Sequence, residues 1–183
     1  MKKQNKLLRQ MILASLFTAM IAVLTCYIKI PTHNGYVHVG DSMIYLAACF
    51  LPTPFALFCG ALGGMFADLL SGYAIYAIPT FIIKALLTLA FDRKSDKLIV
   101  KRNVIALIVG AFITVIGYCI ADAVIFSLSS SSFKDMFFSA TPWITAAYDM
   151  PANLIQAAAS LAIFLALGAA LDKIKIKSKI TER

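Results

Sequence analysis

Long apolar segments alternate with short polar breaks along this chain, and this alternation constrains the fold more than any other feature. The apolar segments cover residues 7–28, 41–51, 54–71, 79–91, 103–127 and 143–171. Hydrophobic residues make up 61% of the 183-residue chain, whereas soluble domains contain about 45–50%. Because a chain inside a bilayer satisfies its backbone hydrogen bonds as helices, the sequence predicts one all-α integral membrane domain over residues 1–183, a bundle of six transmembrane helices.

Basic residues are concentrated near both termini and in one polar break, at residues 2–9, 93–102 and 173–183. Cytoplasmic loops of membrane proteins carry an excess of Lys and Arg. We therefore predict a multi-pass protein of the cell membrane with both termini in the cytoplasm. The breaks that then lie outside are 29–40, 71–78 and 128–142. The net charge of +8 is explained by contact with the bilayer, and we expect no nucleic-acid partner.

Two of the predicted helices are too short to cross a membrane, because a crossing needs about 20 residues. The short segments are 41–51 and 79–91. Either these helices extend into their flanking loops, or the outer loops dip below the membrane surface. Non-helical backbone at that depth is tolerated where protein covers it or where it lines a wet cavity. We favour the dip, which places "VHVGD" and "GYAIYAIPT" in a pocket open to the outside.

Five ionisable residues fall in the predicted outer half of the bundle, each on a different helix. They are Asp41, Asp68, Lys84, Asp122 and Asp149. Charged side chains at membrane depth are costly and mark functional sites by default, so we predict that this group surrounds a binding pocket. The alternative is structural: Asp68–Lys84 and Asp122 would form ion pairs that fix helix register, and Asp41 would cap a helix start.

Polar aromatic residues accompany these charges. They are Tyr73, Tyr76, Tyr118, Trp143 and Tyr148, with His38 and Asn153 as further hydrogen-bonding groups. Such aromatics also serve as anchors at the membrane interface. Pockets for small molecules are apolar concavities with a few placed polar groups, and this composition suits a small polar ring. The predicted substrate-binding residues are His38, Asp41, Asp68, Tyr73, Tyr76, Lys84, Asp122, Tyr148 and Asn153.

The sequence contains none of the common motifs for catalysis or nucleotide hydrolysis. A GxxxxGK[ST] loop, an HExxH pair and a GxSxG turn are all missing. We therefore expect no enzymatic activity and no cofactor bound by this chain. The four cysteines fall singly inside apolar segments, so we interpret them as packing residues and predict no metal site. Energy for uphill transport would come from an ion gradient or from another protein.

Small residues recur at helical spacing on the first and third apolar segments. Gly60-x-x-x-Gly64 is a GxxxG motif, and Ser15-x-x-x-Ala19 is followed by Ala22. Small residues allow helices to approach closely in lipid. Packing within the bundle explains the third segment, whereas the stripe on the first segment could also contact a partner helix.

Three stretches of the chain resemble the substrate-binding S components of energy-coupling factor (ECF) vitamin transporters. They are "GYVHVGDSMIYLAA", "GALGGMFADLLSGYAIYAIPTFIIKALL" and "MPANLIQ". The resemblance covers nearly the whole chain and is closest to the hydroxymethylpyrimidine or pyridoxine branch. It implies a six-helix protein that binds a vitamin from outside and docks on a transmembrane scaffold subunit with two ATPase subunits. The partners use ATP, and the S component topples in the membrane to release its substrate.

The resemblance also implies roles for individual residues. The docking motif of the family, Ala-x-x-x-Ala on the first helix, corresponds to Ser15-x-x-x-Ala19, with serine in place of the first alanine. Its substrate contacts come from the outer loops and outer helix ends. We expect Asp41, His38 and Asn153 to hydrogen-bond the ligand and the tyrosines to stack on its ring. Relatives carry asparagine at the position of His38, so the identity of the vitamin is open.

Two alternatives to this interpretation remain at the level of the sequence. A standalone proton-coupled transporter would use Asp68, Asp122 or Asp149 as proton relays. An S component for another vitamin, such as riboflavin or pantothenate, would keep the same fold with a different pocket.

Overall fold

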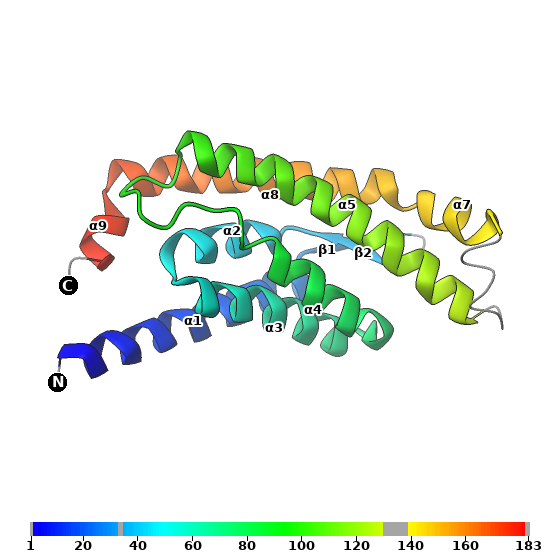
Figure 1. Ribbon diagram of the computed structural model, residues 1–183, viewed down its shortest axis with the longest axis horizontal. Helices are drawn as coiled ribbons and strands as arrows, with labels where there is room; N and C mark the ends of the chain where they lie inside the picture. The colour runs from blue at the N-terminus through cyan, green and yellow to red at the C-terminus, as the bar shows by residue number, and fades with distance from the viewer. Residues whose placement is uncertain (1, 33–34, 130–138, 182–183) are drawn as a thin grey trace.

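The computed structural model describes residues 2–32, 35–129 and 139–181 (Figure 1). The elements are α1 (Lys2–Tyr27), β1 (Lys29–Pro31), β2 (Tyr36–His38), α2 (Asp41–Phe50), α3 (Thr53–Ser71), η1 (Ala74–Tyr76), α4 (Ala77–Leu86), α5 (Lys101–Ser129), α7 (Thr141–Ala147), α8 (Met150–Lys173) and α9 (Ile176–Thr181). Part of the predicted outer loop 128–142 lies outside the described residues.

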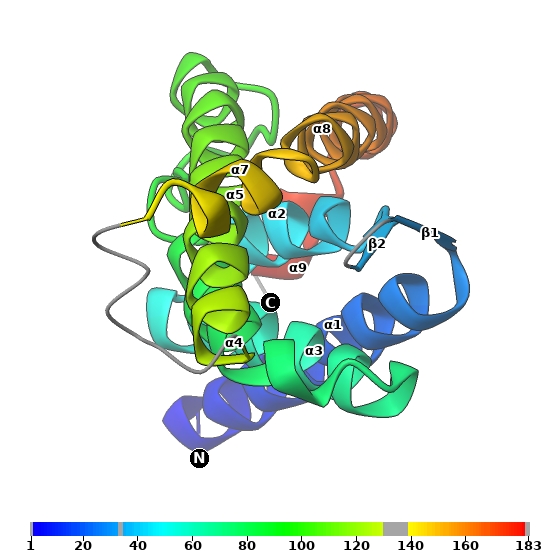
Figure 2. The same ribbon diagram turned by 90° about the vertical axis from the view of Figure 1, so that its right-hand side faces the viewer.

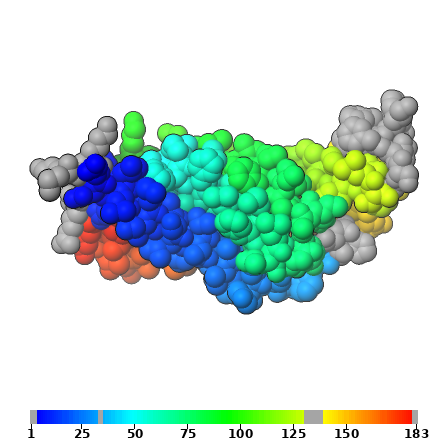
Figure 3. Space-filling view, turned by 90° about the horizontal axis from the view of Figure 1, so that it is seen from below, coloured from blue at the N-terminus to red at the C-terminus, as the bar shows by residue number. Residues whose placement is uncertain are grey.

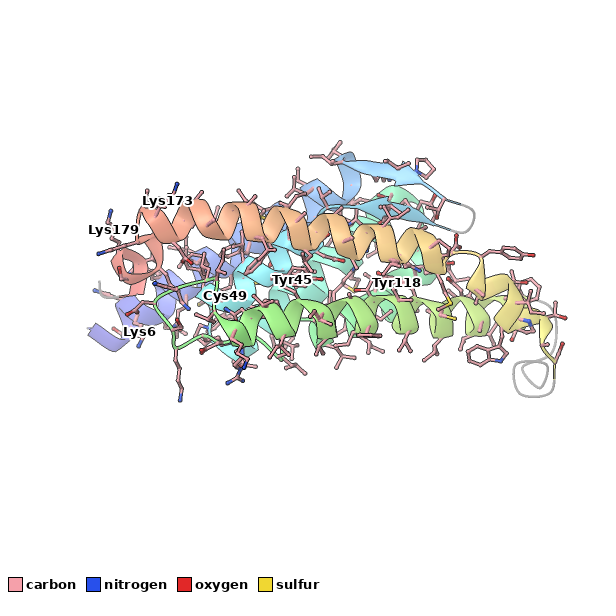
Figure 4. All side chains as sticks on the ribbon, turned by 90° about the horizontal axis from the view of Figure 1, so that it is seen from above. Lys6, Tyr45, Cys49, Tyr118, Lys173 and Lys179 are labelled. Atoms are coloured by element: carbon pink, nitrogen blue, oxygen red, sulfur yellow. The ribbon has the colours of Figure 1, made fainter. Side chains whose placement is uncertain are left out.

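The long helices form two groups that enclose α2. Helices α5 and α8 run side by side, and α1, α3 and α4 lie on the opposite side of the bundle (Figures 1 and 2). Both chain termini lie at the same end of the molecule. The basic residues Lys6, Lys173 and Lys179 also lie at that end (Figure 4), as the charge pattern predicts. The hairpin β1–β2 and α7 are displaced toward the other end.

Helix α2 forms the centre of the bundle. Nine of its ten residues are buried, and it contacts α1, α3 and α8. Its Tyr45 ring packs against Phe91 and Phe164, with ring centroids 5.3 and 6.1 Å away. A ten-residue helix rises about 15 Å, which is half the hydrocarbon thickness. Protein on all sides therefore replaces lipid as its surroundings.

The GxxxG motif of α3 brings that helix close to α4. A Cβ atom added at Gly60 would lie 2.7 Å from the carbonyl oxygen of Lys84, and one added at Gly64 would lie 2.8 Å from the Thr80 side chain. Gly63 faces α1 instead, where an added Cβ would lie 2.7 Å from Ile21. These glycines allow the close helix packing that was predicted for them.

Four helical segments of the described chain are long and apolar enough to cross a membrane: Gln4–Tyr27, Thr53–Ser71, Lys101–Ser129 and Thr141–Lys173. Many of their apolar side chains are exposed on the outside of the bundle, as expected of a surface that faces lipid. Helix α2 and the segment Ala74–Leu86 are shorter. The fold is therefore that of a multi-pass, all-helical membrane protein with one small hairpin.

Three local features differ from the prediction. The break at 29–40 contains an antiparallel hairpin, in which Ile30 pairs with Val37. The predicted helix 143–171 is divided at Tyr148 and Asp149, because Pro151 lacks an N–H and restricts the residue before it. The predicted helix 79–91 ends at Leu86, and turns follow; the Arg93 side chain accounts for two carbonyls there, those of Thr88 and Phe91.

Candidate substrate-binding site

A pocket opens at the end of the bundle away from the termini. Its cavity volume is about 50 Å³, and it is partly open to solvent. The lining comes from α1, the β1–β2 hairpin, α3, the segment 73–80, α5 and the start of α8, at residues Thr25, Thr32, Gly35, Tyr36, Val37, His38, Asp68, Tyr73, Tyr76, Thr80, Tyr118, Asp122, Asp149, Ala152, Asn153 and Gln156. The segments "VHVGD" and "GYAIYAIPT" thus contribute to one pocket, as predicted.

The end of α3 determines where the first tyrosines lie. Gly72 adopts a left-handed conformation with φ of 84°, which glycine reaches without the steric cost of a side chain. The chain reverses there, and the backbone N–H of Tyr73 donates to the carbonyl oxygen of Asp68 at 2.9 Å. The one-turn helix η1 then places Tyr76 in the pocket wall.

Two carboxylates in the pocket wall each accept a hydrogen bond from a tyrosine. The hydroxyl of Tyr36 donates to Oδ1 of Asp68 at 2.6 Å, and the hydroxyl of Tyr76 donates to Oδ1 of Asp122 at 2.8 Å. The rings of Tyr36 and Tyr73 lie close together, with centroids 4.9 Å apart. The wall therefore combines flat aromatic faces with oriented acceptors.

A buried charged cluster lies beneath the pocket. Nζ of Lys84 lies 2.7 Å from Oδ1 of Asp41 and 3.0 Å from Oδ2, and the two side chains are only 1% and 0% exposed. Nε2 of Gln156 donates to Oδ2 of Asp41 at 3.1 Å. The backbone N–H of His38 donates to Oε1 of the same glutamine at 3.3 Å. Gln156 therefore links the pocket wall to the ion pair.

The structure revises the roles that the sequence suggested for these charges. Lys84 pairs with Asp41, not with Asp68, whose Oδ1 accepts a hydrogen bond from Tyr36. Asp41 lies in the first turn of α2, where Gly40 is the N-cap residue, and its carboxylate is directed to Lys84 and Gln156. Asp41 and Lys84 do not line the pocket. They lie beneath it and contact its lining through Gln156 and through Tyr118, whose ring centroid is 5.1 Å from Nζ of Lys84.

The other predicted residues divide clearly between pocket and surface. Within the described chain, those that line the pocket are His38, Asp68, Tyr73, Tyr76, Asp122 and Asn153. Tyr148 is 70% exposed and lies outside it, because the break between α7 and α8 turns it away. Asp149, the residue after Tyr148, is instead buried and lines the wall.

Several lining residues were missed by the site prediction, among them Tyr36, Thr80 and Gln156. Tyr36 alternates with His38 along β2, and Thr80 follows Tyr76 by one helical turn. Gln156 lies one turn beyond Ala152, the neighbour of Asn153. Tyr36 and Gln156 fall inside "GYVHVGD" and "MPANLIQ", so the spacing of two in a strand and four in a helix could have identified them.

His38 lies in the hairpin, outside the membrane-length helices, and is held neutral. The pKa of its imidazole is lowered from 6.5 to about 3, mainly by burial; the charge of Asp41 opposes this change and the charge of Lys84 adds to it. The backbone N–H of Gly40 donates to its Nδ1 at 3.1 Å, which leaves the proton on Nε2. Within the pocket, this ring is therefore a hydrogen-bond donor without charge.

The depressed pKa of His38 predicts a stability loss in acid. The unfolded chain binds a proton below about pH 6.5 and the folded protein binds it only near pH 3, so stability from this group is present above pH 6.5 and is lost as the pH falls. Between pH 7 and pH 5 we expect a loss of about 2 kcal/mol. Thermal unfolding in detergent of the wild type and His38→Gln measures it, and the variant should lack this part of the pH dependence. An identical slope in both proteins would refute the assignment.

A shallow apolar groove runs between α1 and α3 on the outside of the bundle. Its lining includes Ser15, Ala19 and Ala22, the predicted docking residues, together with Phe58 and Phe66. Figure 3 shows the face on which α1 and α3 lie. The small residues form a low strip flanked by larger side chains, which suits the close approach of another helix.

Membrane-length helices around a pocket lined by tyrosines and acids define a multi-pass membrane protein with a candidate small-molecule site. The sequence model of a family described as ECF-type riboflavin transporter, S component, matches residues 5–173, and the chain belongs to this family. No curated protein matches the chain. The family is one of transport subunits, not enzymes. Its description supports the ECF S component expected from the sequence, but not the pyridoxine or hydroxymethylpyrimidine branch.

Proposed function

We propose that this protein is the substrate-binding S component of an ECF importer in the cell membrane and that it takes up a vitamin with a hydroxylated heteroaromatic ring. The observation that carries this proposal is the pocket, where tyrosine rings alternate with carboxylates that accept hydrogen bonds. A scaffold subunit and two ATPase subunits would complete the importer, and ATP would be used on those partners.

The orientation of the pocket follows from the charge distribution. Lys6, Lys173 and Lys179 lie at one end, and Tyr118 in the pocket wall lies toward the other (Figure 4). The excess of basic residues on the cytoplasmic side supports an orientation with both termini inside. In a six-crossing arrangement, the pocket then opens outward and receives its ligand before any contact with ATP.

Riboflavin is our first candidate for the ligand. The description of the family names it, and its flat ring system and hydroxylated side chain match the two kinds of group in the wall. Pyridoxine and hydroxymethylpyrimidine share a hydroxymethylated ring and are the smaller alternatives. Pantothenate, which is anionic and has no ring, fits poorly against Asp68, Asp122 and Asp149.

The positions of the lining residues support specific roles. Tyr36, Tyr73 and Tyr76 are close enough to one another to hold one face of a ring. His38 would donate from Nε2, and Asn153 would donate or accept at the start of α8. The ion pair of Asp41 and Lys84 would act indirectly, by fixing the side chain of Gln156.

Ligand binding to the purified protein tests this proposal. Stacking on tyrosine quenches flavin fluorescence, so we expect titration of riboflavin with the protein to reduce its emission in a saturable manner. Excess pyridoxine or hydroxymethylpyrimidine should not restore the emission. Binding of either of these without binding of riboflavin would show that the vitamin is assigned wrongly. Uptake by this protein alone in proteoliposomes, abolished by collapse of a proton gradient, would favour the proton-coupled alternative over the importer.

The groove of Ser15, Ala19 and Ala22 is the proposed contact with the scaffold subunit. It lies on α1 and α3, whereas the pocket opens at the end of the bundle. Serine in place of the first alanine keeps this strip low, because Oγ of Ser15 donates to the carbonyl oxygen of Met11 in its own helix at 3.0 Å. The hydroxyl is thus satisfied and does not need a partner across the interface.

A further inference from the structure

We infer that the pocket accepts the free vitamin and excludes its phosphate ester; this inference rests on the proposed function and specifies the substrate class of the same site. The exclusion comes from the charge of the wall. Among the described lining residues, acids are present on three different elements and no lysine or arginine is present. A phosphate ester adds a nearly double negative charge at neutral pH.

The acids of the wall are held in place and shielded from water. Asp68 lies on α3, Asp122 lies on α5, and Asp149 lies immediately before α8; they are only 5%, 7% and 6% exposed. Charges so little exposed are screened weakly by salt and interact strongly across a cavity. The tyrosines that donate to Asp68 and Asp122 orient these carboxylates without cancelling their charge.

The nearest cations of the described chain, Lys84 and Lys29, attract the carboxylate of Asp68 but are themselves outside the pocket lining. Lys84 lies beneath the pocket, where Asp41 neutralises it. Lys29 lies on β1, with Nζ 4.8 Å from the ring centroid of Tyr36 and 5.9 Å from that of Tyr73. It contacts two lining rings but is itself outside the lining. A phosphate in the pocket would therefore meet carboxylates before it met an available ammonium group.

Hydrogen bonding points in the same direction as charge. Oδ2 of Asp68 is buried and has no hydrogen-bond partner among the described residues, and a buried polar atom without a partner is costly. A carboxylate can only accept hydrogen bonds. A hydroxyl or ring N–H of the ligand can supply the missing donor, whereas a phosphate dianion placed beside Asp68 would present acceptor oxygens alone. The wall thus selects ligands that donate.

Comparison of riboflavin with riboflavin 5′-phosphate tests the inference directly. We expect the phosphate ester to bind on the order of 30-fold more weakly at neutral pH, since its added negative charge is repelled by several weakly screened acids. Asp122→Asn and Asp149→Asn keep the size of the side chain and remove its charge. Each substitution should reduce the ratio of the dissociation constant of the phosphate ester to that of riboflavin by about threefold or more. Asp96→Asn, an exposed aspartate at the basic end, is the matched control and should leave the ratio unchanged.

Equal affinity for the two forms would overturn the inference. Equal affinity that is lost in Lys29→Gln would overturn it in favour of a phosphate site at Lys29. A ratio that Asp122→Asn and Asp149→Asn fail to change would show that the acids are not its cause. If the vitamin proves to be pyridoxine, the same comparison with pyridoxine 5′-phosphate applies. An error in the choice of vitamin is therefore distinguished from an error in the exclusion of phosphate.

Discussion

Replacement of Asp41 with alanine should lower the unfolding temperature of the detergent-solubilised protein by roughly 10 °C. Lys84 would remain at the centre of the bundle, 1% exposed and without its carboxylate. Removal of one partner from a buried ion pair costs about 3–5 kcal/mol, and in a domain of this size each kcal/mol shifts the unfolding temperature by about 2–4 °C. Ligand binding should weaken as well, because Gln156 loses the acceptor that fixes its side chain.

A second substitution distinguishes the unpaired charge from a simple loss of packing. Lys84→Met in the Asp41→Ala background removes the ammonium group and keeps most of the side-chain volume, so we expect it to recover most of the lost stability. Asp96→Asn, which is exposed, serves as the control for a change of charge alone. An Asp41→Ala protein that unfolds at the wild-type temperature would show that the pair contributes nothing to the fold.

Replacement of Ala19 with tryptophan should abolish vitamin uptake by the complete importer while ligand binding by the isolated protein stays within about twofold of wild type. Ala19 lies in the groove between α1 and α3, and a large side chain there would prevent close approach of a scaffold helix. The pocket is lined by other residues. Uptake in cells and fluorescence titration of the purified protein measure the two effects separately.

The control for this variant places the same side chain on another exposed surface. Ile116 on α5 is 52% exposed, and Ile116→Trp adds an indole to the outside of the bundle away from the groove. We expect its uptake to remain near wild type. Normal uptake by Ala19→Trp, or an equal loss in both variants, would exclude the groove as the docking surface.

The helical framework was accessible from the sequence because apolar length and the requirement to satisfy the backbone leave few choices in a bilayer. The glycines at 60 and 64 also predicted close helix packing correctly. Such a motif predicts that another helix approaches this face, without specifying which helix. The collection of His38, Asp68 and Asp122 around one pocket was predicted for a similar reason. Each is a polar group at the same end of an apolar segment. Because exposure of polar groups to lipid costs free energy, such groups are expected to face one another inside the bundle.

Pairwise partners could not be predicted in this way. The sequence suggested Asp68 as the partner of Lys84, whereas the partner is Asp41, and the choice depends on how α2, α3 and α4 are rotated about their axes. Burial of α2 on all sides decides it, because Asp41 then has no other neutralising group within reach. The outward turn of Tyr148 depends likewise on the geometry of a single break.

The separation of Asp41 and Lys84 along the chain has a consequence for biosynthesis. The two residues are 43 positions apart, so the ribosome completes α2 and α3 before the lysine exists. In a nascent chain that ends before α4, Asp41 has no positively charged partner, and placing its carboxylate at the depth of the hydrocarbon is energetically costly. We therefore expect the first four helices to insert into the bilayer together, after Lys84 has been synthesised and can pair with Asp41.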